Sequence, residues 1–292
     1  YPDGVAAVML GQAFGTPVVI TGRGTDLNLI PQYPAPARKI RWAADHAAGI
    51  VTVAEALVGY LQDLGVEREK VTVLRNGVDL EFFSPADDRE ALRAELGLSG
   101  RVLLSAGVLW ERKGHHLVIE ALPRLLEKLP DLRLLIAGKG EEESRLRALA
   151  ESLGLTDRVV LLGYLDQSEL KRYMQAADAL VLASSREGWA NVLLESMACG
   201  TPVVATPVDG TPEVVEDGRT GILVPPGTVP RGAVQADAGC AGKAAASCRS
   251  RSAGNEARGN TPSLSNGSHQ RRVFVRISSH ASRTLPTWKR MR

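Results

Sequence analysis

Short hydrophobic runs recur along the chain between residues 17 and 224, and each run is four to six residues long. The runs are rich in Val, Ile and Leu, and most are continuous rather than alternating with polar residues. This pattern is typical of strands buried on both faces of a parallel sheet. We therefore predict nine strands, at residues 17–21, 49–53, 71–74, 102–106, 132–137, 159–162, 179–183, 202–205 and 221–224.

Segments with helical periodicity lie between these runs. Their apolar residues recur at three- and four-residue spacing, which places them on one face of a helix. A chain that repeats strand, helix, strand in this way forms a doubly wound α/β fold with helices on both sides of a parallel sheet. The six predicted helices cover residues 35–48, 54–64, 114–129, 141–153, 168–176 and 191–199.

The alternation is interrupted once, between Gly77 and Gly100, by a Ser-Pro pair and the charged stretch 87–95. We interpret residues 84–100 as a linker between two Rossmann-like domains. The first domain, residues 1–83, holds only about three strands and is expected to be incomplete. The second, residues 101–227, holds six and is expected to be largely intact. Because the chain begins at Tyr1 rather than at a methionine, we expect that it is truncated or processed.

Charge marks a further boundary after residue 227. Residues 228–292 contain twelve Lys and Arg but two Asp and Glu, whereas the rest of the chain contains 23 basic and 31 acidic residues. Helical and strand periodicity are missing from most of this tail. It is interpreted either as a disordered basic tail or as a sequence that is not the natural continuation, for example after a frameshift. A tail for nucleic acid or anionic lipid is a third reading, but no nucleic-acid-binding module is recognisable, so no nucleic-acid partner is expected.

Composition narrows the class of protein. The chain is 44% hydrophobic and 23% charged, as in ordinary globular proteins. Its three cysteines have no paired spacing, which argues against a disulfide framework and a zinc site and favours the reducing cytoplasm. No apolar run reaches the roughly 20 residues that span a bilayer, and no signal peptide is recognisable.

Two glutamates at a strand-to-helix junction are the first candidate site. Glu187 follows the predicted strand 179–183, and Glu195 lies one turn into the helix that starts near Asn191. In open parallel sheets, ligands bind at the carboxyl ends of the strands. The helix start offers free N–H groups to a diphosphate, Asn191 can cap the helix, and Gly188 admits a close backbone approach. A carboxylate at Glu195 can accept hydrogen bonds from two ribose hydroxyls. The alternative is a pair of ordinary surface carboxylates.

A basic pair is the second candidate site. Arg112 and Lys113 lie in the loop 105–114, which follows the first strand of the second domain and also contains Gly107. Arg binds two phosphate oxygens at once and Lys supplies a compact charge, so the pair can neutralise a leaving nucleoside diphosphate. The alternative is a solvated basic pair, although two positive charges at a helix start oppose the helix dipole.

The order of these motifs resembles a known family. Residues 1–227 are similar to the retaining glycosyltransferases with the GT-B fold, the glycosyl transferases group 1 of family 4 type. Glu187 and Glu195 match the family's E-x7-E motif, and Arg112-Lys113-Gly114 matches its phosphate-binding step. Further similar segments are 76–79, 137–140, 163–165 and 210–213.

The resemblance implies specific roles for these residues. It assigns Arg112 and Lys113 to the donor diphosphate, Glu195 to the ribose and Glu187 to the hydroxyls of the transferred sugar. The backbone at Asn191 and Val192 would hold the phosphates, and the base would stack near Tyr164. The family moves a sugar from a nucleoside-diphosphate sugar (UDP-, GDP- or ADP-linked) to a glycan or lipid-linked acceptor. The anomeric configuration is retained, and neither a metal nor a cofactor is needed. Lipid-linked acceptors imply peripheral contact with the inner face of the membrane.

Two departures from the family pattern affect the expected activity. Many members have His where this chain has Arg23. We keep Arg23 as a catalytic candidate because Arg can stabilise a leaving phosphate. For Asp26, in the same segment, a structural role is the alternative to a role in the site. The glycine-rich acceptor loop and the final helix that crosses back to the first domain are not recognisable. Two other functions therefore stay open: an inactive nucleotide-sugar-binding fragment, and another GT-B enzyme such as a sugar-nucleotide epimerase.

Weaker signals are interpreted as structural. His115 and His116 lack a second pair of metal ligands, so a packing or surface role is favoured. Cys199 is expected in the core, and Trp110 either stacks on a ligand or covers the edge of the crevice.

Overall fold

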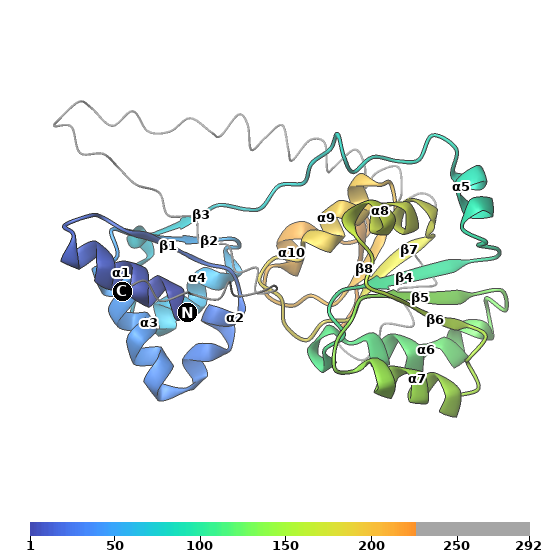
Figure 1. Cartoon of the computed structure of the whole chain (residues 1–292), viewed down its shortest axis with the longest axis horizontal. Coiled ribbons are helices and arrows are strands. Elements are labelled where there is room, and N and C mark those ends of the chain that lie inside the picture. The colour runs from blue at the N-terminus through green and yellow to red at the C-terminus, as the bar shows by residue number, and fades with distance from the viewer. Residues whose placement is uncertain (226–292) are drawn as a thin grey trace, which may run out of the picture.

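The computed structural model describes residues 1–225 and contains two parallel sheets with helices around them (Figure 1). The smaller sheet has the strand order β1-β2-β3, and the larger has the order β6-β5-β4-β7-β8-β9. All pairings are parallel. The strands are β1 (Val19–Gly22), β2 (Gly49–Thr52), β3 (Val71–Val73), β4 (Val102–Ala106), β5 (Arg133–Ala137), β6 (Val159–Gly163), β7 (Ala179–Leu182), β8 (Val203–Ala205) and β9 (Gly221–Leu223).

The first domain surrounds the smaller sheet. Its main core lies between the sheet and α4, where Leu57, Val58 and Leu61 are buried with Ile50 of β2. A second, smaller cluster joins α1 and α3 around Val8. The helical elements of this domain are α1 (Asp3–Ala13), α2 (Thr25–Asn28), η1 (Ile30–Gln32), α3 (Pro34–His46), α4 (Ala56–Asp63) and η2 (Arg68–Lys70).

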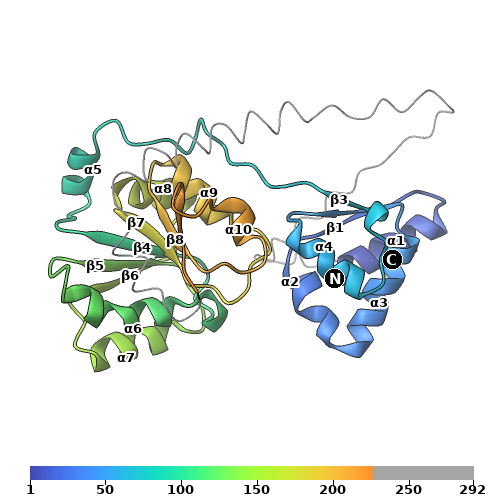
Figure 2. The same cartoon turned by 180° about the vertical axis from the view of Figure 1, so that it is seen from behind.

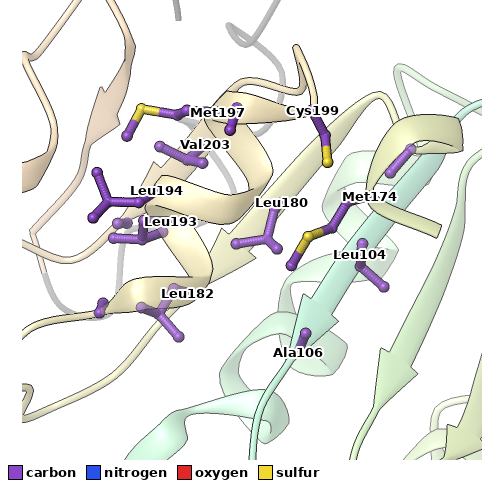
Figure 3. Packing of buried hydrophobic residues seen from close by; sticks show 14 of the residues in the cluster. Leu104, Ala106, Met174, Leu180, Leu182, Leu193, Leu194, Met197, Cys199 and Val203 are labelled. Carbon is purple, nitrogen blue, oxygen red and sulfur yellow. The ribbon is translucent and has the colours of Figure 1, made fainter. Parts of the chain in front are cut away.

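The second domain is a doubly wound sheet with a core on each face. One core gathers side chains of α8 and α9 against the strands (Figure 3), and the other gathers those of α6 and α7. β4 and β7 lie side by side in the sheet, yet the helices that follow them lie on opposite faces. The helical elements here are η3 (Glu111–Lys113), α6 (His115–Leu126), α7 (Glu143–Ser152), α8 (Gln167–Ala176), α9 (Asn191–Ala198) and α10 (Thr211–Val214).

The segment that runs from the first sheet to the second packs against the second domain (Figures 1 and 2). Phe83 is 3% exposed in the second-domain core, and Val78, Leu80 and Phe82 pack against the same core. The predicted linker, residues 84–100, contains the helix α5 (Arg89–Glu95), which contacts α8. The side chain of Asp88 caps α5 by accepting a hydrogen bond from the Ala91 N–H.

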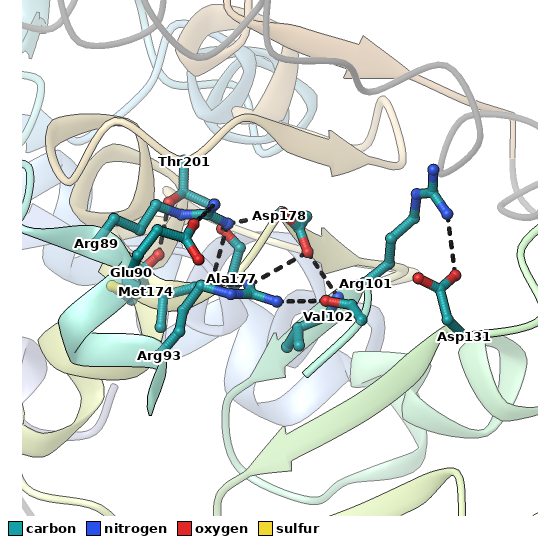
Figure 4. Close-up of polar contacts among 12 residues, drawn as sticks. Arg89, Glu90, Arg93, Arg101, Val102, Asp131, Met174, Ala177, Asp178 and Thr201 are labelled. Atoms are coloured by element: carbon teal, nitrogen blue, oxygen red, sulfur yellow. Dashed lines mark hydrogen bonds and ion pairs between the residues drawn. The ribbon is translucent and has the colours of Figure 1, made fainter. Parts of the chain in front are cut away.

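Charged groups hold α5 against the end of α8 and the N-terminal ends of the central strands β4 and β7 (Figure 4). The buried Arg93 donates to the carbonyl of Ala176, at the end of α8, over 2.7 Å. Arg89 donates to the Asp178 carboxylate over 2.7 Å, and the same carboxylate accepts from the N–H of Val102 over 2.7 Å. Guanidinium groups thus satisfy carbonyls at the C-terminus of α8, where positive charge is favourable.

The nine predicted strands and the doubly wound α/β class are confirmed. Four α-helices were missed: α1, α2, α5 and α10. α1 is hydrophobic all round, with Met9 and Leu10 exposed, so it shows no periodic polar face. The interpretation of residues 228–292 lies outside the described residues.

Candidate functional site

The candidate site lies at the carboxyl ends of β4 and β7. These neighbouring strands lead to helices on opposite faces of the sheet, which is the switch point where ligands bind in open α/β sheets. The loop after β4 carries Arg112 and Lys113, and the loop after β7 carries Glu187 and Gly188. The order of strands in the sheet therefore brings the two predicted motifs together.

The two loops are in direct backbone contact. Gly114 has φ +70°, and a Cβ there would lie 2.1 Å from the carbonyl oxygen of Ala183. Only glycine allows both this conformation and this approach. The N–H of Ser185 donates to the carbonyl of Arg112 over 2.9 Å. Gly107, at φ +153°, lies close to the stem of the Lys113 side chain. The backbone thus holds the basic loop against the acidic one.

Lys113 and Glu187 form a buried ion pair. The distance from Lys113 Nζ to Glu187 Oε1 is 2.5 Å, and the side chains are 16% and 8% exposed. Ser184 Oγ donates to the same oxygen over 2.7 Å. The ammonium has further donors that can bind an anion, and Oε2 of Glu187 is not engaged by either contact.

Arg112 is oriented without a carboxylate partner among the described contacts. Its guanidinium lies 4.8 Å from the centroid of the Trp110 ring, and Nη1 donates weakly to the carbonyl of Arg186 over 3.5 Å. A guanidinium stacked on indole keeps edge donors for a planar or phosphate acceptor. The structure therefore presents Arg112 as the less neutralised member of the basic pair.

Helix α9 begins at Asn191, and Glu195 lies one turn further along it. Burial raises the pKa of Glu195 above its usual value. Val192 is half-buried and packs against the core beneath. The expectation that Asn191 caps this helix is wrong: Ala190 is the N-cap, no side chain caps it, and Asn191 Oδ1 accepts from Asn76 over 3.0 Å.

The first domain reaches the site through the segment 23–26. The carboxylate of Asp26 accepts from the N–H groups of Arg23 and Gly24, over 3.1 Å and 2.8 Å, and so shapes the turn. A Cβ on Gly188 would lie 1.8 Å from the carbonyl oxygen of Arg23. The structure thus places Arg23 beside Gly188, with its side chain exposed.

Tyr164 is not brought into this cluster. It follows β6, which β5 separates from β4, and its side chain is 69% exposed. Its predicted role in stacking the base stays a prediction.

Asp209 was missed by the sequence interpretation, although it accepts hydrogen bonds from Glu187 N–H, Asn28 and Tyr60. Glu213, in the segment 210–213 that resembles the family, accepts from the N–H groups of Glu55 and Ala56. One signal was available: the segment 206–213 follows β8 and so belongs to the same edge of the sheet.

His115 is a buried residue beneath the basic loop. Its Nδ1 lies 2.9 Å from Ser105 Oγ, and the side chain is 1% exposed. Burial lowers the pKa of His115 from 6.5 to about 4; the Val108 carbonyl opposes the shift, and the charge of Lys113 adds to it. The imidazole is therefore neutral at pH 7, and its packing role is consistent with the sequence interpretation. Cys199 is buried as expected.

Between residues 1 and 225, no three His, Cys, Asp or Glu side chains are grouped as metal ligands would be. None of the helices in the same range is long and apolar enough to cross a membrane.

The fold and the site define a two-domain α/β protein with a buried Lys–Glu pair at the switch point of its larger sheet. Residues 88–234 match the model of "Glycosyl transferases group 1" and residues 1–82 match that of "Glycosyltransferase Family 4". The chain belongs to the glycosyl transferases group 1, with the GT-B fold.

Relatives cover the chain only in part. The D-inositol 3-phosphate glycosyltransferase of Streptomyces bingchenggensis is 40% identical over 172 residues, which are 55% of this chain and 38% of that protein. The N-acetyl-alpha-D-glucosaminyl L-malate synthase of Bacillus anthracis is 28% identical over 226 residues, 76% of this chain and 58% of that protein. The chain thus spans less than two thirds of the length of these relatives.

Solved structures share the fold over most of this chain. HepE of Anabaena in complex with UDP has a TM-score of 0.76 at 25% identity, over 85% of this chain and 71% of that one. The same protein was crystallised with UDP-glucose, at a TM-score of 0.74 and 26% identity. Sucrose-phosphate synthase of Thermosynechococcus elongatus has a TM-score of 0.75 at 25% identity, over 86% of this chain and 66% of that one.

Proposed function

We propose that the second domain binds the nucleoside diphosphate of a sugar donor and that the chain serves a retaining glycosyltransferase. The observation that carries the proposal is the Lys113–Glu187 pair at the switch point, with Arg112 held beside it. A diphosphate requires cations, and the transferred sugar requires hydrogen-bond acceptors. At this site the cationic side chains of Arg112 and Lys113 lie next to the carboxylate of Glu187.

The geometry supports a division of roles. Lys113 and Arg112 neutralise the diphosphate, on which negative charge builds as the bond to the sugar breaks. Glu187 accepts hydrogen bonds from sugar hydroxyls while Lys113 and Ser184 hold its Oε1. Glu195, one turn into α9, accepts from the ribose.

The reaction that follows from these roles is transfer from the donor to a glycan or lipid-linked acceptor. The acceptor oxygen bonds to the anomeric carbon on the face from which the diphosphate departs, and the departing diphosphate takes the proton of the acceptor hydroxyl, so the anomeric configuration is retained. The basic pair supplies the positive charge that the leaving group needs, so we propose no metal or cofactor. Arg23, beside Gly188, can approach the leaving phosphate from the first domain.

Binding calorimetry with UDP, GDP and ADP and with their glucose conjugates tests the proposal. UDP is the first choice, because HepE was crystallised with it. Lys113→Ala and Glu195→Ala are each expected to weaken binding about ten- to a hundredfold, the loss of one charge-assisted contact. The matched controls are Lys128→Ala, at an exposed position in the turn after α6, and Glu151→Ala, at an exposed position near the end of α7.

Three outcomes of these binding measurements and of a sugar-transfer assay are informative. Binding of one nucleotide that both site variants weaken, unchanged by a metal chelator, supports it and identifies the base. Binding without sugar transfer would favour an inactive nucleotide-sugar-binding chain. A folded wild-type chain that binds none of the six ligands contradicts the proposal.

A further inference from the structure

One carboxylate connects the first domain to the backbone of Glu187. Asp209 Oδ2 accepts from the Glu187 N–H over 2.9 Å and from Asn28 Nδ2 over 3.1 Å. Its other oxygen, Oδ1, accepts from the Tyr60 hydroxyl over 2.8 Å. Asn28 and Tyr60 belong to α2 and α4 of the first domain, whereas Glu187 belongs to the loop after β7. A single side chain thus joins both domains at the candidate site.

The backbone of Asp209 is held in an unusual conformation. Its φ is +42°, and it is the non-glycine residue with positive φ among residues 1–225. Such conformations cost energy and persist where surrounding contacts impose them, frequently at functional sites. The three hydrogen bonds to its carboxylate are contacts of this kind.

Trp189, in the same loop as Glu187, makes a second contact between the two domains. Trp189, two residues after Glu187, packs against the core of the second domain and against that of the first. Its Nε1 is buried without a hydrogen-bond partner, and so is Oδ1 of Asn28. Buried polar atoms without partners make the contact between the two domains less favourable. The contact therefore depends on the hydrogen bonds that do form across it. Those bonds converge on Asp209.

We propose that Asp209 is a positioning residue that couples contact with the first domain to the placement of Glu187. Lys113 and Ser184 fix the carboxylate of Glu187, and Asp209 fixes its N–H. Release of Tyr60 or Asn28 leaves Asp209 less constrained, and the N–H of Glu187 loses its anchor. The inference rests on the proposed role of Glu187 in binding the sugar.

Hydrogen exchange of the ligand-free chain tests the coupling without reference to activity. Tyr60→Phe removes one hydroxyl from the first domain. We expect amides of residues 185–190 to exchange about tenfold faster, the effect of one weakened hydrogen bond to a charged group. Tyr33→Phe, at an exposed tyrosine of the same domain, is the control and should leave this peptide unchanged. Unchanged exchange at 185–190 in Tyr60→Phe would overturn the proposal.

Nucleotide binding then distinguishes positioning from a general structural role. Asp209→Gly removes the carboxylate and is compatible with the positive φ, so the fold should persist. We expect the affinity for UDP to change less than twofold. We expect the additional affinity that UDP-glucose has over UDP to be lost. Equal weakening of UDP and UDP-sugar would contradict a role through Glu187. Wild-type protein that binds neither ligand would contradict the proposed function, while the exchange experiment would still decide the coupling.

Discussion

Replacement of Lys113 by Met removes the ammonium of the buried pair and keeps most of the apolar stem. It leaves the Glu187 carboxylate, 8% exposed, with Ser184 as the remaining donor to Oε1. Breaking a buried pair from one side costs about 3–5 kcal/mol. Because Ser184 stays and Lys113 is 16% exposed, we expect the lower end, about 3 kcal/mol. For a folded region of this size, that lowers Tm by roughly 6–12 °C.

Calorimetric unfolding of three variants checks this value. Lys113→Met measures the loss in the free energy of unfolding. Lys113→Met combined with Glu187→Gln measures how much of that loss comes from the unpaired charge of Glu187. The double variant should recover at least about half of the loss, since a neutral amide is less costly to bury. Lys128→Met is the control at an exposed lysine. A Tm for Lys113→Met within 2 °C of wild type, or a double variant as unstable as the single one, would refute the reasoning.

Three further predictions concern neighbouring groups. Because burial raises the pKa of Glu195, the wild-type chain loses stability as pH rises from 4.5 through the pKa of the folded state. Glu195→Gln should therefore have a higher Tm than wild type at pH 7 but not at pH 4. Burial lowers the pKa of His115 from 6.5 to about 4, so the neutral imidazole contributes its full share to the free energy of unfolding above pH 6.5. About 3 kcal/mol of that free energy is lost as pH falls to 4. Urea titrations of His115→Gln should show an acid destabilisation that is smaller by this amount. Gly188→Ala places a Cβ 1.8 Å from the Arg23 carbonyl, so hydrogen exchange at residues 24–28 should accelerate, whereas Gly59→Ala, with open space around it, should leave it unchanged.

The strands could be predicted because each buries a continuous apolar run, and this signal is local in the sequence. The position of the site followed from the same signal, since both loops come directly after such runs. The direct contact between Lys113 and Glu187 depends on β4 and β7 being neighbours, which no local pattern encodes. α5 escaped prediction because a short helix, fixed by Arg89, Arg93 and Asp178, lies within a charged stretch next to a proline.

The contacts between the domains could not be predicted from the sequence. Asp209 meets Tyr60 and Asn28 across 149 and 181 residues, and nothing in its sequence neighbourhood distinguishes it from any Asp-Gly turn. Its importance comes from the left-handed backbone and from three donors supplied by distant elements. Such convergence becomes visible only in three dimensions.

The segment after β3 has a consequence for how the molecule unfolds. Val78, Leu80, Phe82 and Phe83 belong to the core of the second domain, although they precede its first strand by about twenty residues. The cooperative unit should therefore begin near Gly77 rather than at β4. A protease that cuts within residues 74–77 should release a second domain that still melts in one transition. A cut within residues 84–88 should instead leave that core without Phe83 and lower its melting temperature.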